Sequence, residues 1–308
     1  GLSISPTVNL VQNIGFSGNT SANYLQLPQT DAVDTENITQ KWLDNDFYVA
    51  NLMAAFEKGT QKLNLGFSYS NYLGDHFGTL IWAQNAGGAL PNHQFYENKG
   101  EKTDTNVFAK LTHAVGRQWT VYTDIQYRWI DYKANGMQAG QVPIDVNLNY
   151  GFFNPKAGVT FSMNPNHQLY FSVARAHKEP NRTDFENGNP LPEELTDFEL
   201  GWRHQKSNLQ FIANAYFMDY TNQLVLTGAI DEVGAPIRTN SGSSYRLGVE
   251  LELSWMMSEQ WQWQSNLSLS ENKNRDFFFK RDGELQALGD TSLSFSPGVI
   301  GGRQLSYS

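Results

Sequence analysis

The sequence has no cysteine and little charge: Asp, Glu, Lys and Arg make up 17% of its 308 residues. Without thiols the chain has no disulfide framework, no thiol nucleophile and no thiolate metal site. It also lacks an apolar run of the roughly 18 residues that a membrane-spanning helix requires. The formal net charge is −9, and Lys and Arg form no cluster. The composition therefore argues against a nucleic-acid partner.

Aromatic residues, by contrast, reach 13%, and apolar residues alternate with polar ones along most of the chain. The segment QWQWQSNLSLS places Trp261, Trp263, Leu267 and Leu269 on one parity and polar residues on the other. Because successive side chains of a strand point to opposite faces, this alternation predicts strands with one apolar and one polar face. The same alternation recurs at 62–70, 119–129, 156–163 and 246–255.

Short and long connections alternate between these segments. The short polar turns lie at 57–61, 114–118, 164–167, 204–208 and 256–260, and the longer loops at 72–103, 132–152, 179–196, 221–243 and 273–291. Two strands of about ten residues fit between successive short turns. We therefore expect an all-β, antiparallel up-and-down meander of about 12 or 13 strands, with tight turns at one end and large loops at the other.

The direction of the apolar face separates two fold classes. A soluble sheet protein would bury that face, but its strands usually have only about five or six residues. Strands of about ten residues are long enough to cross a bilayer at a tilt. Trp residues near the strand ends, such as Trp119, Trp129 and Trp255, are typical of interfacial girdles. We therefore expect residues 1–308 to form a portion of a transmembrane β-barrel.

Several segments go beyond periodicity. Residues 152–185, with the sequence FFNPKAGVTFSMNPNHQLYFSVARAHKEPNRTDF, resemble the mid-barrel segment of TonB-dependent outer-membrane receptors. Further matches follow in the family's order at 191–203, 213–225, 237–253 and 293–302, and the upstream segments 40–48, 74–84 and 103–111 resemble receptors of this family from Bacteroidetes. Residues 1–35 match less well, so their register stays undetermined.

The resemblance implies a barrel of about 22 strands, of which this chain supplies an internal, C-terminal-barrel portion. Nothing in the sequence resembles the TonB box or the plug domain of the family, so we expect the plug to be absent from this chain. The resemblance further implies outer-membrane localisation in a Gram-negative cell, with lipid, the plug and TonB as partners, the last two through segments not in this chain. A surface lipoprotein is a further possible partner.

The function that the resemblance implies is active import of a scarce nutrient, such as an iron siderophore, haem or cobalamin, energised by the TonB–ExbB–ExbD complex. A passive porin-like or structural surface barrel is the alternative, because such barrels also carry long loops. No cofactor is expected.

Loop 72–103 is the main ligand candidate. It combines stacking rings and imidazoles with several glycines, a composition that suits a flat or aromatic ligand such as a catecholate chelate or a porphyrin. The candidate ligand residues are His76, Phe77, Trp82, His93, Phe95 and Tyr96, with Arg238 of loop 221–243 as a second possibility. A loop of this length could equally fold on itself.

Charged residues on the polar parity carry a separate signal. A charge that faces lipid near the midplane costs about 2–4 kcal/mol for Arg or Lys, so these side chains are expected to face the lumen. They are Arg128, Lys156, Arg203, Arg246, Glu250 and Glu252. In the resembled family they would meet the plug, although pairing with one another across strands explains them equally well.

Enzyme signatures are missing from the sequence. It contains no G-x-S-x-G, H-E-x-x-H or G-x-x-x-x-G-K motif, and its six His residues show no metal-ligand spacing. We therefore expect no catalytic residues and no metal site, with a barrel lipase that uses a Ser/His pair as a minor alternative.

Overall fold

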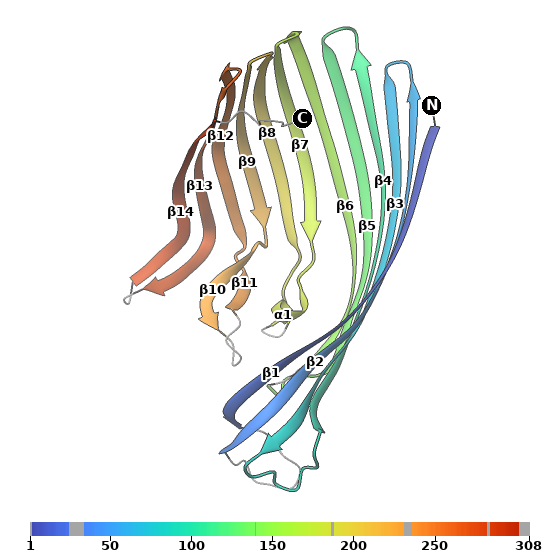
Figure 1. Ribbon diagram of the computed structural model, residues 1–308, viewed down its shortest axis with the longest axis vertical. Coiled ribbons are helices and arrows are strands. Elements are labelled where there is room, and N and C mark those ends of the chain that lie inside the picture. The colour runs from blue at the N-terminus through green and yellow to red at the C-terminus, as the bar shows by residue number, and fades with distance from the viewer. Residues whose placement is uncertain are drawn as a thin grey trace, which may run out of the picture.

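Strands make up almost all of the chain in the computed structural model, which describes residues 2–24, 34–138, 140–185, 188–230, 236–281 and 284–301 (Figure 1). The elements are β1 (Leu2–Tyr24), β2 (Asp34–Lys58), β3 (Gln61–Ala83), β4 (His93–Val115), β5 (Trp119–Met137), β6 (Pro143–Asn164), β7 (His167–Lys178), α1 (Arg182–Phe185), β8 (Glu193–Lys206), β9 (Leu209–Thr221), β10 (Leu224–Ile230), β11 (Pro236–Asn240), β12 (Ser243–Ser258), β13 (Trp261–Arg281) and β14 (Glu284–Gly301). No helix among these residues is long and apolar enough to span a membrane.

The strands follow one another as an antiparallel meander. Twelve of them form a single sheet in the order β1-β2-β3-β4-β5-β6-β7-β8-β9-β12-β13-β14, and β10 pairs with β11 as a separate hairpin. The sheet is long and strongly twisted, with β1 and β2 sweeping across the far end of β3–β6 (Figure 1). The predicted all-β, up-and-down architecture is confirmed.

The short turns lie where the alternation predicts them. Residues 59–60, 116–118, 165–166, 207–208 and 259–260 connect paired strands at one end of the sheet. Gly59 and Gly116 adopt positive φ angles of 58° and 66° there, a conformation that glycine reaches without steric cost. We call the opposite end, which carries α1 and the β10–β11 hairpin, the loop end.

The expected strand length and three of the expected loops are wrong. Strands β2, β3 and β4 have 25, 23 and 23 residues, so most of 72–103 is strand and only 84–92 connect it. Likewise, most of 132–152 and 273–291 belongs to strands. Strands that continue into polar, Gly-rich sequence lack the apolar alternation by which strands are read from sequence. Segment 179–192 does connect two strands, and 221–243 contains the β10–β11 hairpin.

The register places the apolar residues of neighbouring strands on one continuous face. Leu251 lies opposite Leu267, and Leu267 lies opposite Phe295. At the other side of the sheet, Phe67 lies between Leu52 and Val107. Leu52, Phe67, Val107 and Phe295 are exposed, and Leu251 and Leu267 are partly exposed, because the described residues form no second layer over this face. We call this surface the outer face and the opposite, polar surface the inner face.

The apolar character of the outer face ends at a defined level. On β5 the outward side chains other than Thr123 are apolar or aromatic up to Trp129, and beyond it they become Asp131 and Lys133. Trp129 lies opposite Gly151 of β6, where the pattern inverts as well. We call the outward apolar residues on the turn side of this level the apolar band.

Beyond the same level the inner face becomes apolar and buried. Its core residues are Ile130, Tyr132, Ala134, Ile144, Val146 and Phe152, with Phe185 of α1 packed against them. The alternation thus changes phase where the strands leave the apolar band. The outward side chains there meet water, while the inward ones are covered by the segment that contains α1.

Glycines on the inner face lie directly opposite aromatic side chains of the neighbouring strand. The opposed pairs are Gly66 with Phe108, Gly158 with Tyr122, Gly201 with Tyr170 and Gly248 with Tyr216. A Cβ atom on Gly201 would lie 2.1 Å from the Tyr170 ring. Each ring therefore lies over its glycine, which fixes the register and covers exposed backbone.

The sequence alone assigns no register to residues 1–35. The structure describes β1 as pairing with β2 along its length, from Leu2 opposite Phe56 to Tyr24 opposite Asp34. Residues 25–33 and the side chains of 1–35 lie outside what the structure describes.

Candidate functional site

The inner face at the loop end carries the densest polar network, and residues 179–185 form its centre. Glu179 and Pro180 follow β7, and a reciprocal cap then starts α1: the Asn181 amide donates to Asp184 Oδ2 at 2.8 Å and the Asp184 amide to Asn181 Oδ1 at 3.1 Å. Such exchange satisfies the amides at the start of a helical turn. The segment contacts β3 of the main sheet and β11 of the separate hairpin.

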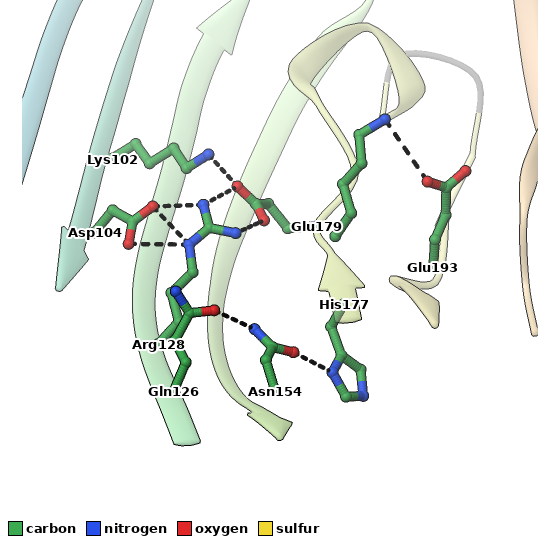
Figure 2. Close-up of polar contacts among 9 residues, drawn as sticks. Lys102, Asp104, Gln126, Arg128, Asn154, His177, Glu179 and Glu193 are labelled. Atoms are coloured by element: carbon green, nitrogen blue, oxygen red, sulfur yellow. Dashed lines mark hydrogen bonds and ion pairs between the residues drawn. The ribbon is translucent and has the colours of Figure 1, made fainter. Parts of the chain in front are cut away.

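Glu179 joins the segment to two strands (Figure 2). Its carboxylate accepts from Arg128 Nη1 at 2.9 Å and from Lys102, while Arg128 Nε also donates to Asp104 Oδ2 at 2.9 Å. The Glu179 side chain is only 8% exposed. Burial alone would raise the pKa of Glu179, but the Lys102 hydrogen bond and the charges of Lys102 and Arg128 hold it below its usual value.

A second contact joins α1 to β3. Arg182 Nη1 donates to His76 Nδ1 at 2.7 Å, so that nitrogen carries no proton. The tautomer with its proton on Nε2 then donates to Tyr72 Oη at 3.2 Å, and Tyr72 donates to Asn45 Oδ1 at 2.7 Å. Burial, reinforced by the Arg182 charge, lowers the pKa of His76 to about 4. His76 is therefore neutral at pH 7.

Arg238, predicted as a ligand residue, is engaged within the chain. Its Nε and Nη2 donate to the two oxygens of Asp184, both at 2.8 Å, and the Asp184 side chain is 2% exposed. This bidentate pair connects β11 to α1.

The other predicted ligand residues of 72–103 lie on strands and do not converge. Tyr96 faces inward opposite Gly78 and is buried. Phe95 packs on Leu80 and contacts Tyr96 edge-on, with ring centroids 5.1 Å apart.

Phe77 and Trp82 lie apart from this inner cluster. Phe77 stacks on Trp42, with ring centroids 6.1 Å apart, on the parity of the outer face. Trp82 is 49% exposed, and His93 begins β4 with its side chain partly exposed. The expectation of one aromatic loop is thus wrong, because β3 and β4 continue as strands whose alternate side chains point to opposite faces.

The six predicted lumen residues do share one face, as the register shows. Lys156 lies opposite Asp124, and Glu252 lies between Ile212 and Asn266. Glu250 occupies the equivalent place between Asn214 and Ser268.

The three arginines of this group have partners within the chain. Arg203 lies over the Tyr170 ring at 4.7 Å and Arg246 over the Tyr220 ring at 5.2 Å. Arg128 pairs with Asp104 of the neighbouring strand. Contact of this face with a plug stays a prediction.

A chain of polar contacts that the sequence did not reveal lies beside the Glu179 network. Asn154 Nδ2 donates to Gln126 Oε1 at 3.1 Å, and His177 Nδ1 lies 2.9 Å from Asn154 Oδ1 (Figure 2). The His177 ring stacks on buried Phe152, 5.2 Å away. On β5 beyond Trp129 and on β6 before Phe153, the apolar residues change from the outward to the inward positions. This change in the alternation is the sequence signal that could have placed these residues inside.

A hollow of about 630 Å³ lies between β10 and the neighbouring parts of β12–β14. Leu224, Leu226, Tyr245, Arg246, Asn272 and Asn274 are among its lining residues. It is polar on the sheet side and apolar on the hairpin side. Among the described residues, no group of three or more His, Asp or Glu side chains is arranged to hold a metal ion.

This arrangement, an up-and-down sheet with an apolar outer band and a polar inner face, defines a class of β-barrel wall. The family model described as "TonB dependent receptor-like, beta-barrel" matches residues 4–307. The chain therefore belongs to the β-barrel family of TonB-dependent receptors. Among curated proteins, none matches the sequence.

Solved structures of receptors share the fold at low sequence identity. The copper transporter OprC aligns with a TM-score of 0.65 and 15% identity over 87% of this chain and 44% of its own. The siderophore receptor PiuA from Acinetobacter baumannii aligns with a TM-score of 0.61 and 16% identity, over 93% of this chain and 46% of its own. The ferripyoverdine receptor of the outer membrane of Pseudomonas aeruginosa aligns with a TM-score of 0.57 and 13% identity, over 95% of this chain and 41% of its own. The chain thus spans less than half the length of these receptors.

Proposed function

We propose that this chain is part of the wall of an outer-membrane receptor that actively imports a scarce nutrient, namely an iron siderophore, haem or cobalamin. The single observation that carries the proposal is the family match over residues 4–307. The apolar band is suited to contact with the hydrocarbon of the outer membrane, and the polar inner face to a lumen. Energy would come from the TonB–ExbB–ExbD complex acting on a plug.

The ligand would be captured at the loop end of the inner face. Support comes from the contacts of His76 with Tyr72 and with Arg182, and from the hollow beside β10. Trp82 is exposed on β3. Trp82 and His93 would bind a ligand where an external loop or a partner covers them. PiuA and the ferripyoverdine receptor carry siderophore names, which favours an iron chelate.

Two finer features belong to the same proposal. Segments 40–48, 74–84 and 103–111 resemble receptors from Bacteroidetes, and some receptors of that type carry a surface lipoprotein over their loops. A lipoprotein partner would contact the loop end, where Leu90, Leu226 and Ile230 are exposed.

The test is growth of a strain that lacks the complete gene on media with a single source of iron (one siderophore, or haem) or of cobalamin, with copper limitation as a further condition. We expect loss of growth on one source, restored by the gene. Deletion of tonB should abolish uptake of the same source. Uptake that persists without TonB, and grows linearly with concentration, would instead identify a passive pore.

A further inference from the structure

Residues 179–185 contact one side of the inner face through three different kinds of interaction. Glu179 binds Lys102 of β4 and Arg128 of β5, Arg182 binds His76 of β3, and Phe185 packs on Tyr132 of β5 with ring centroids 5.7 Å apart. Three neighbouring strands of the main sheet therefore hold this segment in place.

The opposite side of the segment contacts an element that is outside the main sheet. The β10–β11 hairpin forms its own two-stranded sheet, and Arg238 of β11 makes the bidentate pair with Asp184. Since Asp184 also closes the cap with Asn181, the pair binds the hairpin to the capped turn of the segment.

These two sets of contacts act in series. A displacement of β11 pulls on Asp184, the capped turn carries it to Glu179 and Arg182, and these residues hold β3–β5. Charge-assisted, bidentate contacts resist both rotation and separation, whereas an isolated two-stranded hairpin is only marginally ordered in water.

We propose that residues 179–185 are a strap that fixes the β10–β11 hairpin to the β3–β5 wall, so that a ligand or partner that moves the hairpin must also move the Glu179 network. This coupling goes beyond nutrient uptake, because it concerns contacts within the chain itself. The hairpin roofs the hollow that Arg246 and Tyr245 line, and the strap therefore sets how far that hollow opens.

The test uses electron-spin distance measurements on the full-length protein in detergent. Nitroxide labels are placed at Lys133→Cys on β5 and Ala229→Cys on β10, both exposed positions, and this chain adds no native cysteine. In Arg238→Gln we expect the width of the hairpin-to-wall distance distribution to increase by about twofold, since the hairpin then keeps its own pairing and its hydrogen bonds to Leu191 and Glu193 but loses its link to α1.

The widths of the distance distributions in single and double variants distinguish a strap that acts as one continuous link from contacts that hold the hairpin independently. Glu179→Gln should broaden the same distribution, and the double variant should be no broader than the broader single variant. Arg238→Lys, which keeps the charge but loses the bidentate geometry, should fall between the wild type and Arg238→Gln. Arg275→Gln is the matched control, because its ion pair with Asp219 is exposed and 3.4 Å long.

Two results would overturn the strap. One is a distribution in Arg238→Gln as narrow as in the Arg275→Gln control. The other is a double variant whose broadening is the sum of the two single effects, which would indicate separate supports. If Glu179→Gln fails to fold, as heat-modified mobility on gels would show, the two Arg238 variants and their control decide the question.

Discussion

Glu179 is a carboxylate that the fold buries between two cations. Lys102 and Arg128 lie on neighbouring strands β4 and β5, and Asp104 balances the second positive charge. Removing one member of such a group costs more than the pair itself contributes, because the remaining charge is left buried and unpaired.

We therefore predict that Glu179→Gln lowers the free energy of unfolding by about 3–5 kcal/mol. Urea unfolding in detergent micelles, followed by tryptophan fluorescence, measures this value. Glu57→Gln is the control, since Glu57 also pairs with a lysine, Lys62 at 2.9 Å, but both side chains are more than half exposed. Equal effects of the two substitutions would contradict the burial argument.

His76 gives stability a pH dependence with a defined sign. Its pKa is about 4 in the folded chain against an ordinary value of 6.5, so the unfolded chain binds the proton first. Stability therefore falls as the pH drops from about 6.5 toward about 4. We predict that His76→Gln flattens this part of the profile. The pH dependence of unfolding in both proteins is the measurement, and an unchanged slope would refute the assignment.

Glu179 contributes to acid sensitivity separately. Its pKa is lowered on folding, so its stabilising effect is present above the unfolded pKa and is lost as the pH falls through the folded pKa. The His76→Gln protein should therefore keep the loss of stability at the acidic end of the profile, which separates the two groups.

At the scale of the strand, the recurring device is a glycine opposite an aromatic ring. The Tyr170 ring covers Gly201. The Tyr170 hydroxyl donates to Asn214 Oδ1 at 3.0 Å, and the Arg203 guanidinium lies over the Tyr170 ring. A methyl group at Gly201 would displace the ring from both contacts.

We predict that Gly201→Ala destabilises the fold by about 1–3 kcal/mol, the range for overpacking. Gly100→Ala is the matched control, because a Cβ there lies no closer than 3.8 Å to any neighbour. Urea unfolding of the two variants tests the difference. An equally large loss in Gly100→Ala would assign the effect to the loss of glycine itself.

The level of Trp129 and Gly151 marks where the outer face changes from apolar to charged. We predict that Val249→Arg, in the apolar band, costs about 2–4 kcal/mol of folding free energy in lipid vesicles, and Asp131→Arg, above it, about 0–1 kcal/mol. Reversible folding into vesicles measures both. Similar costs at the two positions would place the membrane boundary elsewhere.

At the scale of the molecule, none of the elements that the structure describes covers the outer face of the sheet. Side chains such as Trp129 at 48% and Leu269 at 47% exposure would contact water in the absence of lipid. We predict that the 308-residue chain stays monodisperse only in detergent and otherwise forms inclusion bodies or aggregates. Size-exclusion chromatography with and without detergent checks this. A detergent-free monomer with a cooperative melt would contradict it.

Much of the fold could be predicted from the sequence, because alternation within a strand is a local property. The short turns, the antiparallel order and the shared face of Arg128, Lys156, Arg203, Arg246, Glu250 and Glu252 all follow from it. The long strands were missed, because beyond the apolar band the alternation changes phase and loses contrast. The sequence pattern therefore predicts one loop for His76 and Phe77, although a strand separates them onto two faces.

The sequence by itself determined which side chains of each strand lie together, since the two-residue period of a strand needs no long-range information. Only the tertiary structure decided which polar residues meet across the inner face. Glu179 lies far from Lys102 in the chain, and Asp184 far from Arg238, and both pairs form because residues 179–185 turn inward across the concave side. Such contacts depend on sheet curvature and on the depth to which a connection folds, neither of which is encoded in local periodicity.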